Sequence, residues 1–282
     1  MRRRLAIVLA AAVALGLATP WTAAQAKPLV VTQNYLAVGD SITAGAGVSS
    51  IEAFPSRLDA ASKRLALAGN MSVSNATIDG VRAQLTAFPT TFPGASPEAV
   101  TKITLTVGAN DIQWGEILLF CLDRPLAFPC ASQDVGGGVT FKTLVDARIV
   151  AFSAQLPLLL TEAHGQYGNA KIYVAGYYEL FGTRKQTCRL GGGHFITAAD
   201  KAWYNATTLS LNSAIKTAVA DANALIGHRA VKYVNVASRF NGHGFCDSAT
   251  PWIIGPEGAA PGHPTAKGQK AYADAFHAAG AR

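Results

Sequence analysis

The sequence has few charged residues and few cysteines for its 282 residues. Charged side chains make up 15% of it, and it has four cysteines and two methionines. After residue 4 no run of lysines and arginines occurs, so there is no basic segment of the kind that binds nucleic acid. No C-x-x-C or H-E-x-x-H spacing indicates a zinc site. With no repeat and no low-complexity tract, the sequence predicts one large domain.

The first 26 residues have the three parts of a secretory signal peptide. Residues 2–4 are arginines, residues 5–18 are apolar, and Ala24-Gln25-Ala26 is a small-x-small cleavage site before Lys27. The apolar part is short for a membrane span, and we expect no later segment to cross a bilayer. The sequence therefore predicts export, cleavage near Ala26 and Lys27, and a secreted domain of residues 27–282 without a stable membrane anchor.

The four cysteines are an even number in an exported chain, which favours disulfides over metal ligands or a catalytic thiol. Three pairings are possible. Cys121 and Cys130 are close in sequence, so we prefer the pairs Cys121–Cys130 and Cys188–Cys246. A zinc site with His243 and Cys246 is the alternative, and no usual ligand spacing supports it.

Short apolar runs alternate with longer amphipathic segments. The predicted strands are 29–38, 71–74, 103–107, 171–176 and 231–236. The main predicted helices are 54–68, 141–163, 198–225 and 263–278, and 81–85 is expected to form a single helical turn. Strands that alternate with helices predict an α/β fold, with a mainly parallel sheet covered on both faces.

Polar residues follow the first three predicted strands, at the edge where such sheets bind ligands. Ser41 follows the first strand and could attack an acyl carbonyl if a base took its proton. Gly80 follows the second strand and Asn110 the third. The N–H groups of Ser41 and Gly80 and the Asn110 amide would then supply three donors to an oxyanion. Asp40 and Asp111 are expected to organise turns.

The base must come from six histidines. Three of them have simpler structural explanations, because His164 and His228 lie near helix C-termini and His277 lies inside the last helix. His194 is in a glycine-rich loop, and His243 is close to Cys246. His263 starts the last predicted helix, on the loop after the fifth strand, which brings it to the same edge as Ser41. We therefore select His263.

These residues resemble the four blocks of the SGNH (GDSL-type) hydrolases. Gly39-Asp40-Ser41, Gly80, Gly108-Ala109-Asn110-Asp111 and His263-Pro264 occur in the family's order. The resemblance implies a flavodoxin-like three-layer α/β/α sandwich, with a five-stranded parallel sheet of order 2-1-3-4-5. It implies Ser41 as nucleophile, His263 as base, and Ser41, Gly80 and Asn110 as oxyanion donors. No metal or organic cofactor is implied.

Residues 176–181 and 243–247 are similar to the secreted actinobacterial esterase and lipase branch of that family. Most of the superfamily has an acid three residues before the histidine, where this sequence has Ala260. In the branch, a main-chain carbonyl near that position orients the histidine, so the Ala260 carbonyl is our first candidate. Glu257 and Asp247 are the alternatives. Members of the branch often have three disulfides, whereas only two are possible here.

The predicted function is a secreted serine ester hydrolase, either a carboxylesterase or a lipase. We expect a monomer that acts on a small-molecule, lipid or polymer ester. A carbohydrate acetylesterase with the same site is one alternative, and a non-catalytic secreted module that binds glycans or lipids is another. Five side chains after strand ends could either line an acyl pocket or pack in the core: Trp114, Leu118, Tyr177, Tyr178 and Phe181.

Overall fold

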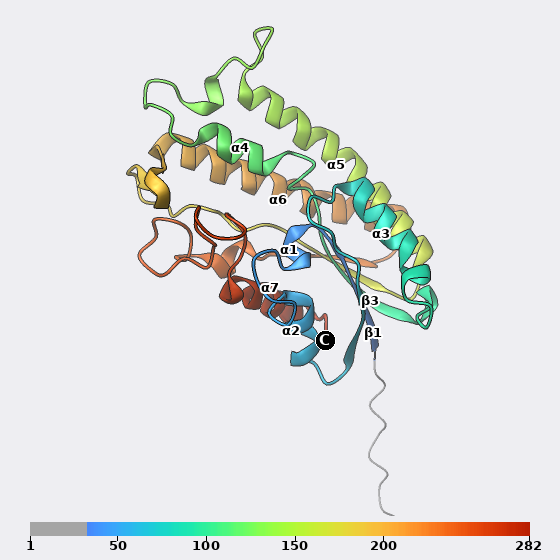
Figure 1. Cartoon of the computed structure of the whole chain (residues 1–282). Coiled ribbons are helices and arrows are strands. Elements are labelled where there is room, and N and C mark those ends of the chain that lie inside the picture. Colours follow the sequence, from blue (N-terminus) through green and yellow to red (C-terminus); the bar gives the residue numbers. More distant parts are fainter. Residues whose placement is uncertain (1–32) are drawn as a thin grey trace, which may run out of the picture. The chain divides into compact units, whose positions relative to one another are not determined.

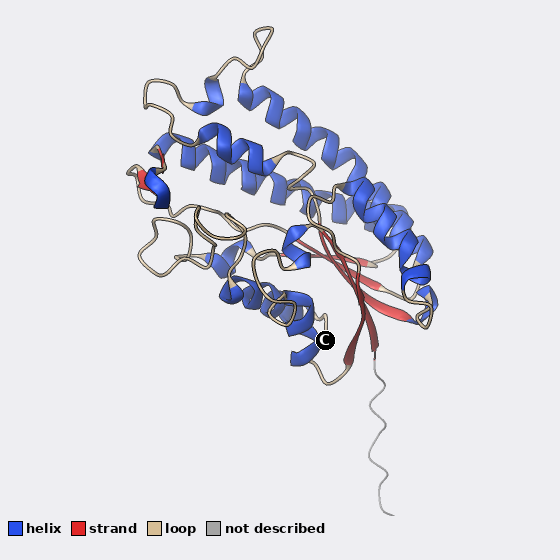
Figure 2. Ribbon diagram, viewed as in Figure 1, coloured by secondary structure: helices blue, strands red, loops and turns tan. Residues whose placement is uncertain are grey.

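A five-stranded parallel sheet lies between two layers of helices (Figures 1 and 2) in a computed structural model that describes residues 33–282. The strands are β1 (Gln33–Gly39), β2 (Leu65–Asn70), β3 (Val100–Thr106), β4 (Lys171–Ala175) and β7 (Val231–Val234). Their spatial order is β2-β1-β3-β4-β7, and every pair is parallel. Numbered along the chain, the strands of this sheet have the order 2-1-3-4-5, which confirms the predicted fold class. The predicted signal peptide and the start of the first predicted strand lie outside the described residues.

Helices cover both faces of the sheet (Figure 1). On one face lie α2 (Phe54–Ala61) and α7 (Ala266–Ala279), and on the other lie α3 (Ile78–Thr91), α5 (Phe141–Gln166) and α6 (Ala198–Ile226). The short α1 (Ser41–Ala44) follows β1 directly, and α4 (Trp114–Cys121) lies beside α6. The smaller elements are the hairpin of β5 (Cys188–Arg189) and β6 (Phe195–Ile196) and 3-10 turns at Pro97–Ala99, Cys130–Ser132, Gly191–Gly193 and Ala237–Phe240.

The predicted helix over 54–68 is wrong beyond Ala61. Leu65–Asn70 instead forms β2 and pairs in parallel with β1. The run Leu65-Ala66-Leu67-Ala68 fits the helical period and the strand period equally, so pairing with β1 decides its structure. The predicted strand 71–74 continues from β2 as an irregular segment, whose Met71 and Val73 N–H groups donate to the carbonyls of Ala37 and Gly39.

α3 is also longer than the single turn predicted over 81–85, and it continues through Pro89. A proline in a helix lacks the N–H that would bond to the carbonyl four residues earlier, here Leu85. The Leu85 carbonyl accepts instead from the Tyr167 hydroxyl at 2.7 Å and from Gln166 Nε2 at 3.0 Å. Contacts with the end of α5 therefore satisfy the carbonyl that Pro89 leaves without a helical donor.

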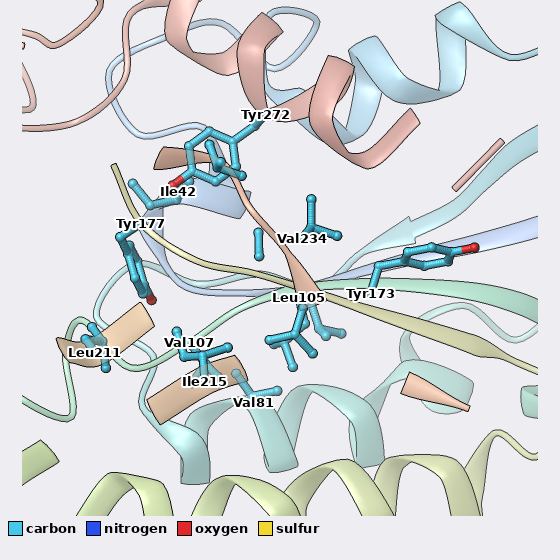
Figure 3. Packing of buried hydrophobic residues seen from close by; sticks show 14 of the residues in the cluster. Ile42, Val81, Leu105, Val107, Tyr173, Tyr177, Leu211, Ile215, Val234 and Tyr272 are labelled. Carbon is cyan, nitrogen blue, oxygen red and sulfur yellow. The ribbon is translucent and has the colours of Figure 1, made fainter. Parts of the chain in front are cut away.

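The buried core lies on both faces of the sheet. Figure 3 shows Val107 close to Val81 of α3 and Ile215 of α6, with Ile42 and Tyr272 on the opposite side. By length and composition α5 could cross a membrane, so the expectation that no later segment qualifies is wrong. The buried residues of α5 pack in this core, and the helix lies along α6 and α3, as core helices of globular domains do.

Two disulfides are present, and they are the preferred pairs. Cys121 and Cys130 have Cα atoms 5.1 Å apart, and Cys188 and Cys246 have Cα atoms 5.7 Å apart. Cys246 is therefore not free to bind zinc. His243 stacks on Trp252 with ring centroids 3.7 Å apart. Over residues 33–282, no group of three His, Cys, Asp or Glu side chains is arranged to hold a metal ion.

We expect the Cys188–Cys246 disulfide to stabilise the fold more than Cys121–Cys130, because it links residues 58 rather than 9 positions apart. From loop-closure entropy, replacing both cysteines by alanine should lower the free energy of unfolding by about 4 kcal/mol for the long loop and about 2.5 kcal/mol for the short one. Guanidinium unfolding of the two double variants measures the difference. Equal losses, or the reverse order, would contradict the expectation.

Candidate active site

Ser41 lies directly after β1, in the first turn of α1. β1 ends at Gly39 with a φ of 138°, a conformation that favours glycine. A Cβ at Gly39 would lie 2.5 Å from the Thr106 carbonyl oxygen and 2.7 Å from Thr43 Oγ1. Asp40 then caps α1, since its Oδ1 accepts from the Ile42 N–H at 2.9 Å. These contacts hold the half-buried Ser41 at the carboxyl end of the sheet.

The Ser41 hydroxyl meets the imidazole of His263, which comes from a position 222 residues later. Ser41 Oγ and His263 Nε2 are 2.8 Å apart. His263 Nδ1 lies 3.2 Å from the carbonyl oxygen of Pro261. A carbonyl can only accept, so this contact assigns the imidazole proton to Nδ1 and leaves the Nε2 lone pair facing the hydroxyl. In this tautomer His263 can take the Ser41 proton.

Pro261, and not Ala260, supplies the carbonyl beside the imidazole of His263. The Ala260 carbonyl instead accepts from the His263 main-chain N–H at 3.2 Å. Residues 260–263 form a β-turn with Pro261 and Gly262 at its centre, and Gly262 has a φ of 79°. The first carbonyl of such a turn is used to close it, so the second carbonyl is the one left for the ring.

Neither alternative carboxylate is the hydrogen-bond partner of His263. Asp247 Oδ2 accepts from the Gly244 N–H at 2.9 Å, and the Glu257 carboxylate lies beside Gly191 and Gly192. The Glu257 side chain therefore contacts the hairpin of β5 and β6, and the Asp247 side chain contacts the segment that follows β4. The imidazole of His263 is held by main chain.

The three predicted oxyanion donors lie on adjoining elements. Gly80 is the third residue of α3, and first-turn N–H groups have no acceptor within a helix. The same holds for the Ser41 N–H in α1. Asn110 Nδ2 donates one hydrogen to the Ala76 carbonyl at 2.8 Å, which leaves its second N–H for a ligand. Asp111 Oδ1 accepts from the Ile78 N–H at 3.1 Å, so the segment after β3 is attached to the start of α3.

Asp40 is fully buried, and its carboxylate joins several elements around Ser41. Its Oδ1 accepts from the Thr106 hydroxyl at 2.7 Å, and its Oδ2 accepts from the Tyr177 hydroxyl at 2.5 Å. The Tyr177 hydroxyl in turn accepts from the Ala109 N–H at 3.1 Å. Burial raises the pKa of Asp40, and the hydrogen bonds from Tyr177, Thr106 and Ile42 oppose that rise.

Tyr177, Tyr178 and Phe181, for which the sequence left an acyl pocket and core packing open, are buried in the core. Two buried residues near the site were not identified from the sequence. Gln84 and Gln269 are buried polar residues that bond to main chain near Ser41. In the sequence, Gln84 and Gln269 could have been found as glutamines that lie between the apolar residues of the buried face of a helix.

Comparison with known proteins gives one family and a set of similar folds. The sequence profile of the GDSL-like lipase/acylhydrolase family matches residues 37–271. An extracellular lipase from Streptomyces rimosus is 22% identical with a TM-score of 0.64, and the match covers 88% of this chain and 100% of the lipase. Phospholipase A1 from Streptomyces albidoflavus NA297 is 21% identical with a TM-score of 0.61, covering 88% and 99%. An acetylxylan esterase from Geobacillus stearothermophilus is 14% identical with a TM-score of 0.51, covering 88% and 94%. No curated protein sequence matches.

We expect Tyr177→Phe to destabilise the fold more at neutral pH than at acid pH. Burial raises the folded-state pKa of Asp40, so the stability linked to its protonated form is lost as pH rises through that pKa. The Tyr177→Phe variant lacks a hydrogen-bond donor to the ionised Asp40 carboxylate, so its Asp40 pKa is higher than in the wild type. The stability that the variant loses relative to the wild type therefore grows as the pH rises. Above that pKa we expect a loss of about 1.5–3 kcal/mol.

Tyr167→Phe is the matched control, because the Tyr167 hydroxyl donates to the neutral Leu85 carbonyl. The loss of stability in Tyr167→Phe should be the same at every pH between about 4 and about 8, because a main-chain carbonyl does not titrate in that range. Urea unfolding at a series of pH values measures both variants. A Tyr177→Phe loss that is as constant as the control's would contradict the role of the Asp40 charge.

Proposed function

The chain belongs to the GDSL-like lipase/acylhydrolase family and is an ester hydrolase, and on this premise we propose that it acts through an acyl-enzyme formed on Ser41. The observation that carries the proposal is the 2.8 Å contact between Ser41 Oγ and His263 Nε2. The Pro261 carbonyl at Nδ1 supports it, because it selects the tautomer that a general base needs.

In the proposed reaction, Ser41 Oγ attacks the ester carbonyl carbon while its proton moves to His263 Nε2. The oxyanion that forms accepts hydrogen bonds from the N–H groups of Ser41 and Gly80 and from Asn110 Nδ2. The ester C–O bond then breaks, and the leaving alkoxide takes the proton from Nε2 to become the alcohol. Water repeats the sequence on the acyl-enzyme, releasing the carboxylic acid and restoring Ser41. No step uses a metal or an organic cofactor.

The positive charge that develops on His263 has one hydrogen-bond partner at Nδ1 in this proposal. The Pro261 carbonyl accepts from Nδ1, although a neutral oxygen stabilises an imidazolium less than a carboxylate does. The carboxyl group of Asp40, the residue before Ser41, is fully buried, and burial raises its pKa; the attraction to His263 is the smallest of the contributions that oppose this rise.

We propose that the protein is a monomeric, secreted carboxylesterase or lipase of the actinobacterial branch. The signal-peptide pattern of residues 1–26 and the two disulfides support an exported protein. A carbohydrate acetylesterase would use the same groups, and an acetylxylan esterase is among the proteins of similar fold. Rates on a panel of p-nitrophenyl esters from acetate to palmitate, together with acetylated xylan, separate these substrates.

Ser41→Ala should abolish turnover of p-nitrophenyl acetate and labelling by a fluorophosphonate probe, because both need the serine oxygen as nucleophile. Ser153→Ala, in α5, is the control and should behave like the wild type. Equal turnover by wild type and Ser41→Ala would contradict the assignment. A wild-type protein that neither turns over esters nor reacts with the probe would favour a non-catalytic binding module.

Glu257→Gln and Asp247→Asn should each keep most of the wild-type kcat, because main chain holds the imidazole of His263. His263→Ala, which removes the base itself, should lower kcat by about 10²–10⁴-fold. Steady-state kinetics on one ester compare the three variants. A loss in either carboxylate variant as large as that of His263→Ala would identify a triad acid and overturn the main-chain arrangement.

A further inference from the structure

Three buried polar side chains outside the four family blocks each bond to the segment that carries Ser41. They are Gln84, Tyr177 and Gln269, and they are 5%, 1% and 0% exposed. We propose that each is a positioning residue that holds the Ser41 segment against one of the other functional elements. This inference rests on the proposed function, since it concerns where the oxyanion donors and the base lie relative to Ser41.

Gln84 connects the Ser41 segment to the helix that carries Gly80. Its Oε1 accepts from the Gly39 N–H at 2.7 Å, and its Nε2 donates to the Gly39 carbonyl at 2.9 Å. Gln84 is four residues after Gly80 in α3, so the two residues lie on the same side of the helix, one turn apart. A carboxamide with both ends bonded has one orientation. The position of the Gly80 N–H relative to Ser41 is therefore set through Gln84.

Tyr177 connects the Ser41 segment to the Asn110 segment. Its hydroxyl donates to Asp40, next to Ser41, and accepts from the N–H of Ala109, next to Asn110. Its main chain is itself held, because Asn212 accepts from the Tyr177 N–H and donates to the Tyr177 carbonyl, both at 2.7 Å. The Tyr177 hydroxyl oxygen therefore joins Asp40, which precedes Ser41, to Ala109, which precedes Asn110.

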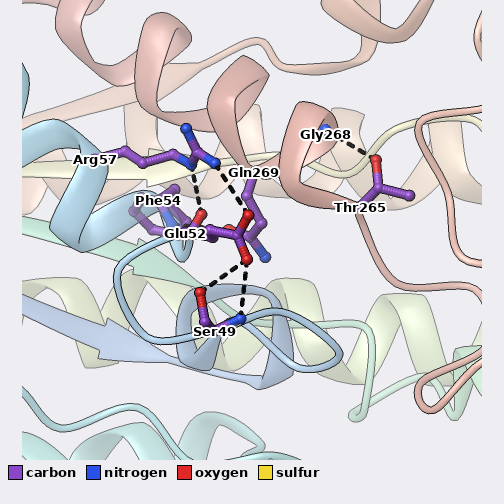
Figure 4. A network of polar contacts seen from close by, with 7 residues as sticks. All are labelled: Ser49, Glu52, Phe54, Arg57, Thr265, Gly268 and Gln269. Carbon is purple, nitrogen blue, oxygen red and sulfur yellow. Dashed lines mark hydrogen bonds and ion pairs between the residues drawn. The ribbon is translucent and has the colours of Figure 1, made fainter.

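Gln269 connects the Ser41 segment to the helix that follows His263. Its Nε2 donates to the Ile42 carbonyl at 3.0 Å, and its Oε1 accepts from the Phe54 N–H at 2.9 Å. Figure 4 shows this side chain reaching from α7 toward Phe54; Thr265, whose hydroxyl caps α7 by accepting from the Gly268 N–H, begins the same helix. Since His263 lies just before α7, this contact helps to set the distance between Ser41 Oγ and His263 Nε2.

The Ser41 segment needs restraints of this kind because its own structure is short. α1 has four residues, fewer than a helix needs to be stable alone. The three side chains contact the residues on both sides of Ser41, at Gly39, Asp40 and Ile42, and leave Ser41 itself free. A misplacement of about 1 Å between reacting groups can lower a rate about 10²-fold. Loss of one restraint should therefore affect kcat more than KM.

The test compares Gln84→Met, Tyr177→Phe and Gln269→Met with Asn223→Leu. Asn223 is a matched control, because its carboxamide also makes two bonds to one residue, accepting from the Val231 N–H and donating to the Val231 carbonyl, both at 2.9 Å. Val231 begins β7, at the end of the sheet opposite Ser41. All four variants should lose stability, whereas only the first three should lose kcat, by about 10–100-fold at nearly unchanged KM.

Gln84→Asn and Gln269→Asn serve as second variants if a methionine variant does not fold. The shorter carboxamide adds no charge to the buried site but cannot keep both main-chain bonds, so kcat should fall as in the methionine variants. The kinetics are measured under conditions in which circular dichroism shows every variant to be folded. The inference is overturned if none of the three positions loses more kcat than Asn223→Leu does. A wild type without ester turnover overturns the proposed function first and this inference with it.

A double-variant cycle separates positioning from a general loss of structure. Asn110→Ala alone should lower kcat about 10²–10³-fold. If Tyr177 acts through the Asn110 donor, Tyr177→Phe should lower kcat much less in the Asn110→Ala background than in the wild type, while its effect on stability remains. Full additivity of the two kcat losses would overturn the role of Tyr177.

Discussion

The burial of the Asp40 carboxylate is the constraint on which the site depends. A charge removed from water is tolerated only where hydrogen-bond donors surround it. Here the donors come from three parts of the fold: the Ile42 N–H in α1, the Thr106 hydroxyl at the end of β3, and the Tyr177 hydroxyl after β4. Moving any of these parts would leave the carboxylate short of a donor. The carboxylate therefore holds the residues beside Ser41 at one position on the edge of the sheet.

The parallel sheet brings Ser41, Asn110 and His263 to one edge, and Gly39 allows a close approach there. β1 and β3 are neighbours, so the segments after them, with Ser41 and Asn110, leave the sheet side by side. Gly39 permits this because any Cβ would meet the Thr106 carbonyl. His263 reaches the same edge from the loop after β7, on the far side of the sheet order, and α7 then returns across the face.

The imidazole of His263 contacts a main-chain carbonyl of a turn and not a carboxylate. Pro261 and Gly262 have the conformational preferences that such a turn requires, and closing it places one free carbonyl beside the imidazole. The turn is itself held at its third residue, because the Tyr178 hydroxyl donates to the Gly262 carbonyl at 2.5 Å. The buried carboxyl group of Asp40 lies on the Ser41 side of the Ser41–His263 pair.

The sequence by itself determined the fold class and the residues at the sheet edge, because alternating strands and helices, Gly39-Asp40-Ser41, Asn110 and His263 are local patterns. It did not determine the boundary between α2 and β2, since Leu65 to Ala68 fits both periods and β1 decides between them. The partners of buried polar groups, such as those of Gln269 and Ile42, were also decided only by the tertiary structure. These two residues are 227 positions apart. A buried amide bonds to whatever main chain the packing brings within about 3 Å, and no local sequence pattern specifies that distance.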